Sequence, residues 1–160
     1  MSPAPTPGPQ ELLGGTALGV FRLNGQFLAV FEEMARPAGL TAARWQVLGA
    51  VLNGPLPVAG IARTMGITRQ SVQRIADLLV ESGLAAYEPN PAHRRAKLLR
   101  PTDEGLEAVR RITPGYTELA ERLTAELGPE QFAETIRVLE RLSAAMDTVA
   151  DPDRTPQAAR

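Results

Sequence analysis

The sequence contains no cysteine and only one histidine. Without cysteine the chain can form no disulfide, no thiolate metal site and no thiol-based redox sensor. One histidine is too few for a metal cluster of the histidine-rich kind. We therefore expect neither a metal centre nor a cofactor.

Membrane and export signals are also missing. The sequence has no uninterrupted apolar run long enough to span a bilayer, and its N-terminus lacks the basic start and apolar middle of a signal peptide. A chain of 160 residues, 44% hydrophobic and 22% charged, has the composition of an ordinary soluble globular protein. We expect a cytoplasmic protein that has no membrane partner.

The usual features of an enzyme are absent as well. There is no glycine-rich phosphate loop and no cysteine nucleophile, and the single histidine stands in a predicted loop without evident serine and aspartate partners. The carboxylates are scattered over amphipathic helix faces, where simple solvation accounts for them. The sequence therefore predicts that the protein is not an enzyme.

Charge is distributed unevenly along the chain. The net charge of −1 argues at first against nucleic acid, because binders usually carry a basic surface. Residues 63–100, however, contain seven basic and three acidic side chains, a net charge of +4, which leaves −5 for the remainder. A basic centre between acidic arms suits a protein whose middle meets an anion and whose ends meet something else.

Residues 66–83 predict one short helix with a signal at each end. Thr68 is a suitable N-cap, and Gly83 stands where a left-handed residue would end the helix. One face is apolar at helical spacing, through Val72, Ile75, Ala76 and Leu79. The opposite face begins with Arg, Gln and Ser, side chains suited to base edges and phosphates in a major groove. The alternative interpretation is a solvated face.

Apolar spacing predicts further helices on both sides of this segment. One spans 11–36, where four glycines weaken it enough that it needs tertiary or partner contacts to persist. Another spans about 40–52 with Thr41 as its N-cap, and a weaker one spans 58–65, because Pro57 replaces the expected capping residue. After Gly83 the period changes, and 84–88 and 96–100 predict a β-hairpin with a basic loop.

The C-terminal third predicts two long helices. Thr102 caps the first, a seam of apolar residues follows, and Pro114 should kink or briefly break the helix. Gly128 and Pro129 separate it from the second helix, which runs to about Ala150. The ends, 1–10 and 151–160, have the composition of a disordered leader and tail.

Three helices followed by a hairpin with a basic tip are the elements of a winged helix-turn-helix, in that order. From Leu40 to Gly105 the chain resembles the MarR family of bacterial transcription regulators. The resemblance is carried by Leu40-Thr41, Trp45-Gln46-Val47-Leu48, Gly54-Pro55-Leu56, Ile61-Ala62-Arg63, Gly66-Ile67-Thr68-Arg69-Gln70-Ser71-Val72, Leu79-Val80-Glu81-Ser82-Gly83-Leu84, Arg94-Arg95-Ala96 and Pro101-Thr102-Asp103-Glu104-Gly105.

The resemblance implies a mainly α fold with a small β-hairpin wing: a winged helix-turn-helix over 37–101 between dimerisation helices at 11–36 and 102–150. It implies a homodimeric regulator, a repressor, with its recognition helix in the major groove and its wing in the minor groove of a pseudo-palindromic operator in double-stranded DNA. The residues it assigns to DNA are Thr68, Arg69, Gln70, Ser71, Gln73, Arg74, His93, Arg94 and Arg95.

The chain departs from the family pattern at the wing and at the helix before the recognition helix. His93 stands where the family usually has an aspartate that orients the wing arginine, so we expect a wing that is organised differently. Pro57 and Gly60 replace the usual capping pair, which leaves the rigidity of helix 58–65 in question. Absence of cysteine excludes the peroxide-sensing branch of the family.

Two alternatives stay open at this level. A winged helix can serve as a protein–protein interaction module without operator binding, although such a module would be expected to lose the arginines that are present here. Family members often bind small aromatic effectors, and Phe31, Trp45 and Tyr116 are the candidates to line such a site. Aromatic residues at helical spacing are otherwise simply part of a core.

Overall fold

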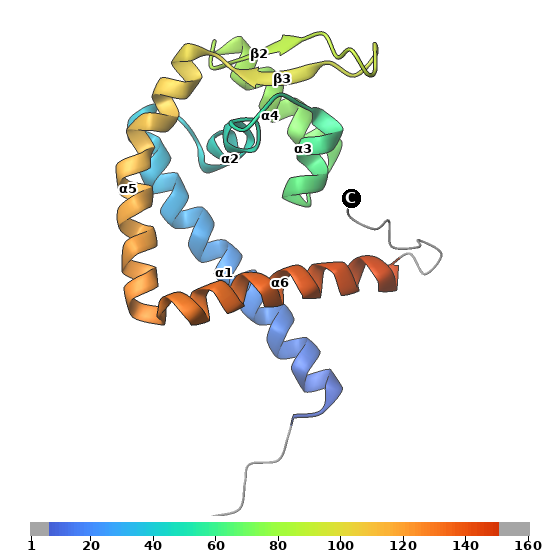
Figure 1. Cartoon of the computed structure of the whole chain (residues 1–160), viewed down its shortest axis with the longest axis vertical. Helices are drawn as coiled ribbons and strands as arrows, with labels where there is room; N and C mark the ends of the chain where they lie inside the picture. Colours follow the sequence, from blue (N-terminus) through green and yellow to red (C-terminus); the bar gives the residue numbers. More distant parts are fainter. Residues whose placement is uncertain (1–6, 151–160) are drawn as a thin grey trace, which may run out of the picture. The chain divides into compact units, whose positions relative to one another are not determined.

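The computed structural model of the chain describes residues 7–150, and the chain divides into two compact units, Met1–Pro114 and Gly115–Arg160. Mostly helical elements follow one another along the chain (Figure 1). They are α1 Pro9–Ala35, the 3₁₀ helix η1 Arg36–Ala38, α2 Ala42–Ala50, β1 Leu56–Pro57, α3 Val58–Met65, α4 Arg69–Glu81, β2 Ala85–Glu88, β3 Leu98–Pro101, α5 Asp103–Leu127 and α6 Pro129–Ala150.

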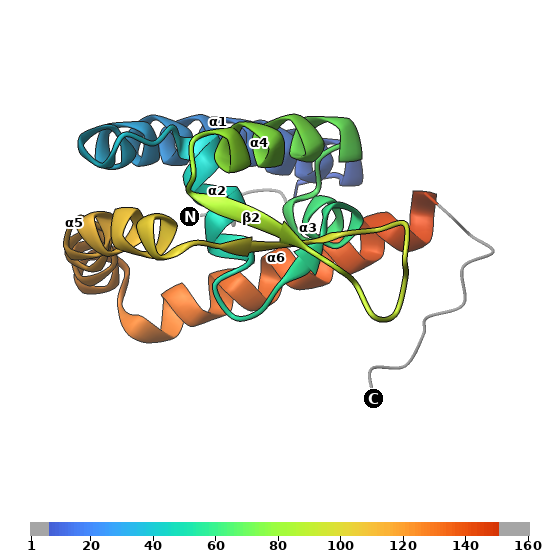
Figure 2. The same ribbon diagram turned by 90° about the horizontal axis from the view of Figure 1, so that it is seen from above.

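The first unit is a winged helix-turn-helix, which confirms the predicted fold class. Helices α2, α3 and α4 lie beside one antiparallel sheet whose strand order is β1-β3-β2, and the loop between β2 and β3 projects from it (Figures 1 and 2). One apolar core joins these elements to the end of α1 and the start of α5. Its largest fully buried side chains are Leu48, Ile61, Leu79, Leu99, Val47, Val51 and Val72.

Helix α4 has the ends that its sequence predicts. The Thr68 side chain accepts a hydrogen bond from the backbone N–H of Ser71 at 3.1 Å. At the other end Gly83 takes a φ of 75°, and the N–H of Leu84 donates to the carbonyl of Leu79 at 2.9 Å. These signals fix where the helix starts and stops, and the apolar spacing between them decides which of its residues point into the core.

Helix α3 persists without a side-chain cap. Its N-cap is Pro57, which makes no side-chain hydrogen bond to the helix. The same residue belongs to β1, in which Leu56 and Pro57 pair with Leu99 and Leu98 of β3. The sheet therefore holds the start of α3 where a capping side chain is missing. A strand of two residues has no alternating pattern, so the sequence did not predict it.

Helix α1 is longer at its N-terminus than the predicted helix over 11–36. It begins at Pro9 and continues through all four glycines to Ala35. The backbone N–H of Gly8 donates to the Glu11 carboxylate at 2.9 Å, which supports this early start. Residues 1–6 of the predicted leader, and the predicted tail over 151–160, lie outside the described residues.

Helix α5 passes through Pro114 as one continuous helix, so of the two predicted outcomes the brief break was wrong and the kink stays a prediction. Proline removes one backbone hydrogen bond of the helix, and the bonds on either side of it are enough to keep the helical path. The boundary between the two units falls at this point, between Pro114 and Gly115. Among the described helices, none is both long enough and apolar enough to cross a membrane.

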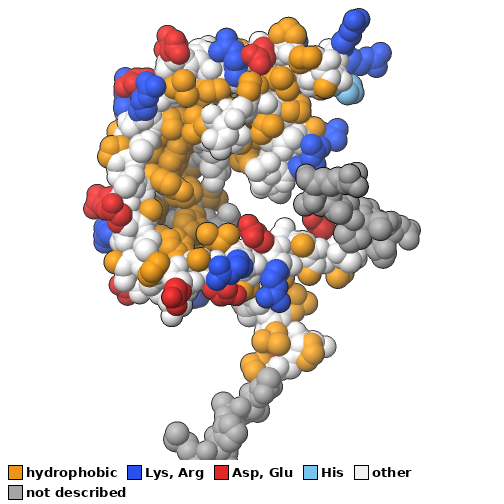
Figure 3. Space-filling model, viewed as in Figure 1, with side chains coloured by type: hydrophobic (Ala, Val, Ile, Leu, Met, Phe, Trp, Pro, Cys, Tyr) orange, Lys and Arg blue, Asp and Glu red, His pale blue; other side chains and the backbone are white. Residues whose placement is uncertain are grey.

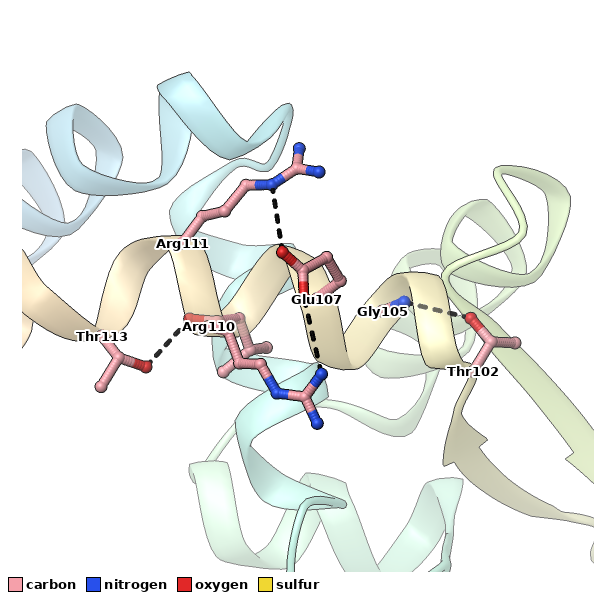
Figure 4. Close-up of polar contacts among 7 residues, drawn as sticks. Thr102, Gly105, Glu107, Arg110, Arg111 and Thr113 are labelled. Carbon is pink, nitrogen blue, oxygen red and sulfur yellow. Dashed lines mark hydrogen bonds and ion pairs between the residues drawn. The ribbon is translucent and has the colours of Figure 1, made fainter.

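The start of α5 is fastened to the turn after α4, and Figure 4 shows the hydrogen bond between Thr102 and Gly105 that belongs to this contact. The Thr102 hydroxyl donates to the Gly83 carbonyl at 2.7 Å and accepts from the N–H of Gly105 at 3.1 Å. The N–H of Thr102 donates to the Leu84 carbonyl at 3.1 Å. A Cβ atom at Gly105 would overlap that carbonyl oxygen, which is backbone and cannot swing aside. Glycine is therefore what lets α5 begin this close to the end of α4.

We predict opposite effects on stability from two helical glycines. Gly105→Ala should lower the free energy of unfolding by about 1–3 kcal/mol, because the new methyl group has no space. Gly49→Ala, in α2, should raise it by about 0.5 kcal/mol, because a Cβ there meets nothing within 4 Å. Urea denaturation followed by circular dichroism measures both. Equal stability of the two variants would contradict the close approach of α5 to Leu84.

Candidate nucleic-acid interface

A groove of about 590 Å³ brings the predicted recognition helix and the predicted wing together. One side is the first two turns of α4, another is Pro57 with the first residues of α3, and the third is the C-terminal part of the β2–β3 loop. The residues that line it are Pro57, Val58, Ala59, Arg69, Gln70, Gln73, Tyr87, Arg95, Ala96 and Lys97. Three cations and two amides therefore face one hollow of the first unit.

The first turn of α4 presents its polar side chains to solvent. Arg69 and Gln70 are exposed and line the groove, and Arg74 is exposed one turn further along. Ser71 is turned back toward the cap, since its hydroxyl lies 2.8 Å from that of Thr68. Thr68 and Ser71 thus hold the start of the helix, and the longer side chains beside them are the ones that extend outward.

The wing loop is built from two consecutive turns. The Asn90 side chain accepts from the N–H of Ala92 at 3.0 Å, and the N–H of His93 donates to the Asn90 carbonyl at 3.2 Å. The N–H of Ala96 then donates to the His93 carbonyl at 3.0 Å. Arg94 and Arg95 are exposed between these turns. Figure 3 shows basic side chains and the histidine grouped at the free end of the hairpin.

Arg100 differs from the other basic residues of this region. Its guanidinium Nε lies 3.2 Å from the Glu88 carboxylate, across the β2–β3 pair. An exposed ion pair of this kind adds little stability, but it occupies the arginine at the base of the wing. The cations available at the groove are therefore those of α4 and of the loop.

Gln73 is held by two residues that the sequence analysis did not select. Its Nε2 lies 2.8 Å from Oδ1 of Asp77 and 2.8 Å from the hydroxyl of Tyr87, and the tyrosine hydroxyl in turn donates to the same Asp77 oxygen at 2.7 Å. Asp77 lies one helical turn beyond Gln73, whereas Tyr87 belongs to β2. We call these three side chains the Gln73 triad. It ties the exposed face of α4 to the wing.

The pKa of the Tyr87 hydroxyl reflects this environment. Partial burial is the main cause that raises it from 10.0 to about 12, and the hydrogen bond to Asp77 and the negative charge of Asp77 add to the rise. The hydrogen bond from Gln73 acts in the opposite direction. Tyr87 therefore stays protonated at physiological pH and keeps its donor directed at Asp77.

The nine predicted DNA-binding residues fall into three groups. Arg69, Gln70, Gln73 and Arg95 line one groove, Thr68 and Ser71 form the helix cap, and Arg74, His93 and Arg94 are exposed outside the groove lining. Sequence reasoning missed Lys97, Asp77 and Tyr87. The spacing of Gln73 and Asp77 by four residues on one helix was a signal for that pair, but no local pattern brings Tyr87 to them.

The predicted effector residues belong to both units. Phe31 and Trp45 pack edge to face with ring centroids 5.1 Å apart, and Phe27 lies next to Phe31 at 5.5 Å. All three are half-buried in the first unit. Tyr116 follows Pro114 and belongs to the second unit. A shared ligand site of these residues stays a prediction.

Comparison with known proteins identifies the family of this fold. The sequence model of the MarR family matches residues 38–96, which include α2, α3, α4 and the wing loop. An uncharacterized protein of Mycobacterium tuberculosis is 38% identical over 127 residues, which cover 79% of this chain and 89% of that protein. The chain belongs to the MarR family. It is therefore a winged-helix transcription regulator by family, and the predicted resemblance is confirmed.

Further similar proteins match more of the chain than the winged helix. A putative transcriptional regulatory protein for the hcr operon of Thauera aromatica is 28% identical over 139 residues, 82% of this chain and 84% of that one. A mutant MarR of Escherichia coli, solved in complex with operator DNA, superposes with a TM-score of 0.71 at 19% identity and covers 85% of this chain and 99% of its own. The likeness in fold therefore includes the long helices on both sides of the winged helix.

The titration of Tyr87 provides a test of the Gln73 triad. The phenolate absorbance that is present in the wild type and missing in Tyr87→Phe should appear around pH 12 rather than pH 10. Because the folded-state pKa is the higher one, the neutral hydroxyl stabilises the fold fully below pH 10, and this contribution is lost as the pH rises toward 12. A titration of the difference absorbance with its midpoint at pH 10 would show that the Tyr87 hydroxyl does not form the hydrogen bonds of the Gln73 triad.

Proposed function

We propose that this MarR-family chain acts as a homodimeric repressor that binds a pseudo-palindromic operator in double-stranded DNA. The observation that carries the proposal is the groove, in which Arg69 and Gln70 of α4 face the same space as Arg95 and Lys97 of the wing. We further propose that it acts in the cytoplasm and has no catalytic activity.

The chemistry of the groove suits two kinds of DNA contact. Arg69 and Gln70 have the planar, forked donors and acceptors that pair with base edges in a major groove. Arg95 carries a cation on a loop that projects from the sheet, where it can enter a narrow minor groove with its concentrated negative potential. Lys97 is a compact charge that suits phosphate. One subunit would then contact one half-site through both grooves.

Exposed apolar surface supports the homodimer. Eight large apolar residues of α1 are exposed: Leu12, Leu13, Leu18, Val20, Phe21, Leu23, Leu28 and Val30. At 100° per residue all of them except Leu18 fall within one half of the helix circumference, so α1 presents a broad apolar face that needs to be covered. Helix α6 adds Ile136, Val138, Leu139, Met146 and Val149. A second copy of the chain, which offers the same surfaces, is the proposed cover.

An aromatic effector is a further part of the proposal. The edge-to-face pair of Phe31 and Trp45, 5.1 Å apart by ring centroid, joins α1 to α2. A flat ligand that inserted beside this pair would change how α1, which would lie in the dimer, meets the DNA-binding helices. Trp45 is the only tryptophan of the chain, so its fluorescence is the measurement that tests this part.

The experiment for operator binding starts without a known operator. The full chain should enrich one pseudo-palindromic sequence from a random pool of duplex DNA in the presence of competitor DNA. Its affinity for that sequence should fall steeply with salt, because Lys and Arg displace condensed counterions from the phosphates. If no sequence is enriched from the pool, the proposal of operator binding is contradicted, and the alternative of a protein–protein interaction module is favoured.

We predict that replacing an arginine of α4 and replacing an arginine of the wing affect DNA binding in different ways. Arg69→Ala should weaken the free energy of operator binding by about 1–3 kcal/mol and relax selectivity at one position of each half-site. Arg95→Ala should weaken binding, reduce the salt slope and lower the preference for a narrow minor groove. Fluorescence anisotropy with the selected DNA and with a scrambled duplex measures both effects. Arg110→Ala is the matched control, since Arg110 is paired with Glu107 on α5 (Figure 4) and does not line the groove.

We predict that charge on α1 separates the subunits. Leu18 and Phe21 are 71% and 72% exposed, so their replacement by Glu removes little from the core of the first unit. The double variant should sediment as a monomer at micromolar concentration and should lose operator binding. Leu52→Glu, at an exposed leucine that follows α2, should remain dimeric. A wild-type protein that sediments as a stable monomer would contradict the homodimer.

A further inference from the structure

The Gln73 triad has a consequence for which base the recognition helix can read. A glutamine side chain has a donor arm, the NH₂ group, and an acceptor arm, the carbonyl oxygen, and either can be turned toward DNA. A free glutamine contacts adenine with both arms. In this protein the environment of Gln73 is not symmetrical, and that asymmetry decides which arm is turned inward.

Asp77 fixes the orientation of the amide. An ionised carboxylate accepts hydrogen bonds and donates none, so the arm 2.8 Å from its Oδ1 must be the nitrogen. The opposite orientation would place two acceptor oxygens against each other. Tyr87 reinforces this choice, because its own proton is directed at Asp77 at 2.7 Å and its lone pairs then accept from Gln73 at 2.8 Å.

The two N–H groups of Gln73 therefore have two acceptors within 2.8 Å inside the protein. The carbonyl oxygen Oε1 lies on the opposite arm of the amide. Gln73 is exposed and lines the groove next to Arg69 and Gln70. The atom that this residue can offer to a base edge is thus an acceptor.

We propose that Tyr87 and Asp77 are positioning residues that restrict Gln73 to accepting a hydrogen bond, so that it selects a base with an exocyclic amine, adenine or cytosine, at one position of each half-site. In the major groove these two bases present an N–H donor, at N6 and N4, whereas guanine and thymine present the acceptors O6 and O4. A carbonyl oxygen of Gln73 held toward guanine or thymine would face another acceptor oxygen and could form no hydrogen bond with it. The inference rests on the proposed operator binding and specifies one position within it.

The test is a base-by-base profile of the selected operator, measured with the full chain by anisotropy. Wild type should bind adenine or cytosine at one position roughly three- to tenfold better than guanine or thymine. Gln73→Ala should remove this preference at that position alone, which identifies the base that Gln73 contacts. Other positions of the half-site should keep their profile.

Tyr87→Phe and Asp77→Ala then test the positioning role. Both variants should flatten the preference at the Gln73 position. Asp77→Ala should show the largest gain in affinity for guanine, because the NH₂ group of Gln73 is then released and can donate to O6 or N7. Removal of the Asp77 charge also strengthens binding to all sequences alike, so the ratio between bases is the readout. A purely structural role would weaken every position equally. Ser82→Ala is the control: it removes a hydroxyl that donates a hydrogen bond to the Leu78 carbonyl at the end of α4, and it should leave the base-by-base profile unchanged.

The outcomes separate this inference from the proposed function. Operator binding with a Gln73 position that prefers guanine, or that keeps its preference in both Tyr87→Phe and Asp77→Ala, would overturn the inference and leave the function standing. So would a Gln73→Ala profile identical to the wild type. Failure of the wild-type chain to select any sequence would overturn both.

Discussion

Burial of one face of α4 determines what the protein presents to DNA. Val72, Ala76 and Leu79 are completely buried in the core, so the rotation of the helix about its own axis is fixed. Gln70, Gln73 and Arg74 then have to face outward, because they lie at the other angles of the same helix. Arg69 is exposed because it is the first residue of the helix. The winged helix around α4 holds this orientation: β1 supports the start of α3, and the Thr102–Gly105 contact fastens α5 to the end of α4.

Residues close in sequence made much of this predictable. Thr68 and Gly83 mark the ends of α4, and the period of two at 84–88 and 96–100 marked the hairpin, since each signal acts within a few residues. Strand β1 was not predictable in this way, because Leu56 and Pro57 become a strand only through Leu99 and Leu98. The continuity of α5 through Pro114 was missed because proline is a strong local signal against a helix, and a long helix can override it.

The candidate site shows the same division. The sequence alone was enough to select the cations of α4 and the wing, since their charge and position are local properties. What the sequence could not show is how a side chain is turned. Gln73 was selected as a reader of DNA, and the structure adds that its amide nitrogen is held by Asp77 and by Tyr87, which lies on another element. A hydrogen bond between α4 and β2 depends on tertiary packing, which no spacing rule describes.

Lys97 is the only lysine in the chain, and it lines the groove together with Arg69 and Arg95. All the other cationic side chains of fixed charge are arginines, which do not react with reagents directed at primary amines. Apart from the amino terminus of the chain, such a reagent therefore finds a single target, and that target is at the proposed DNA surface. A fluorophore or a charge-removing acyl group can be attached there by ordinary acylation, without any change to the sequence.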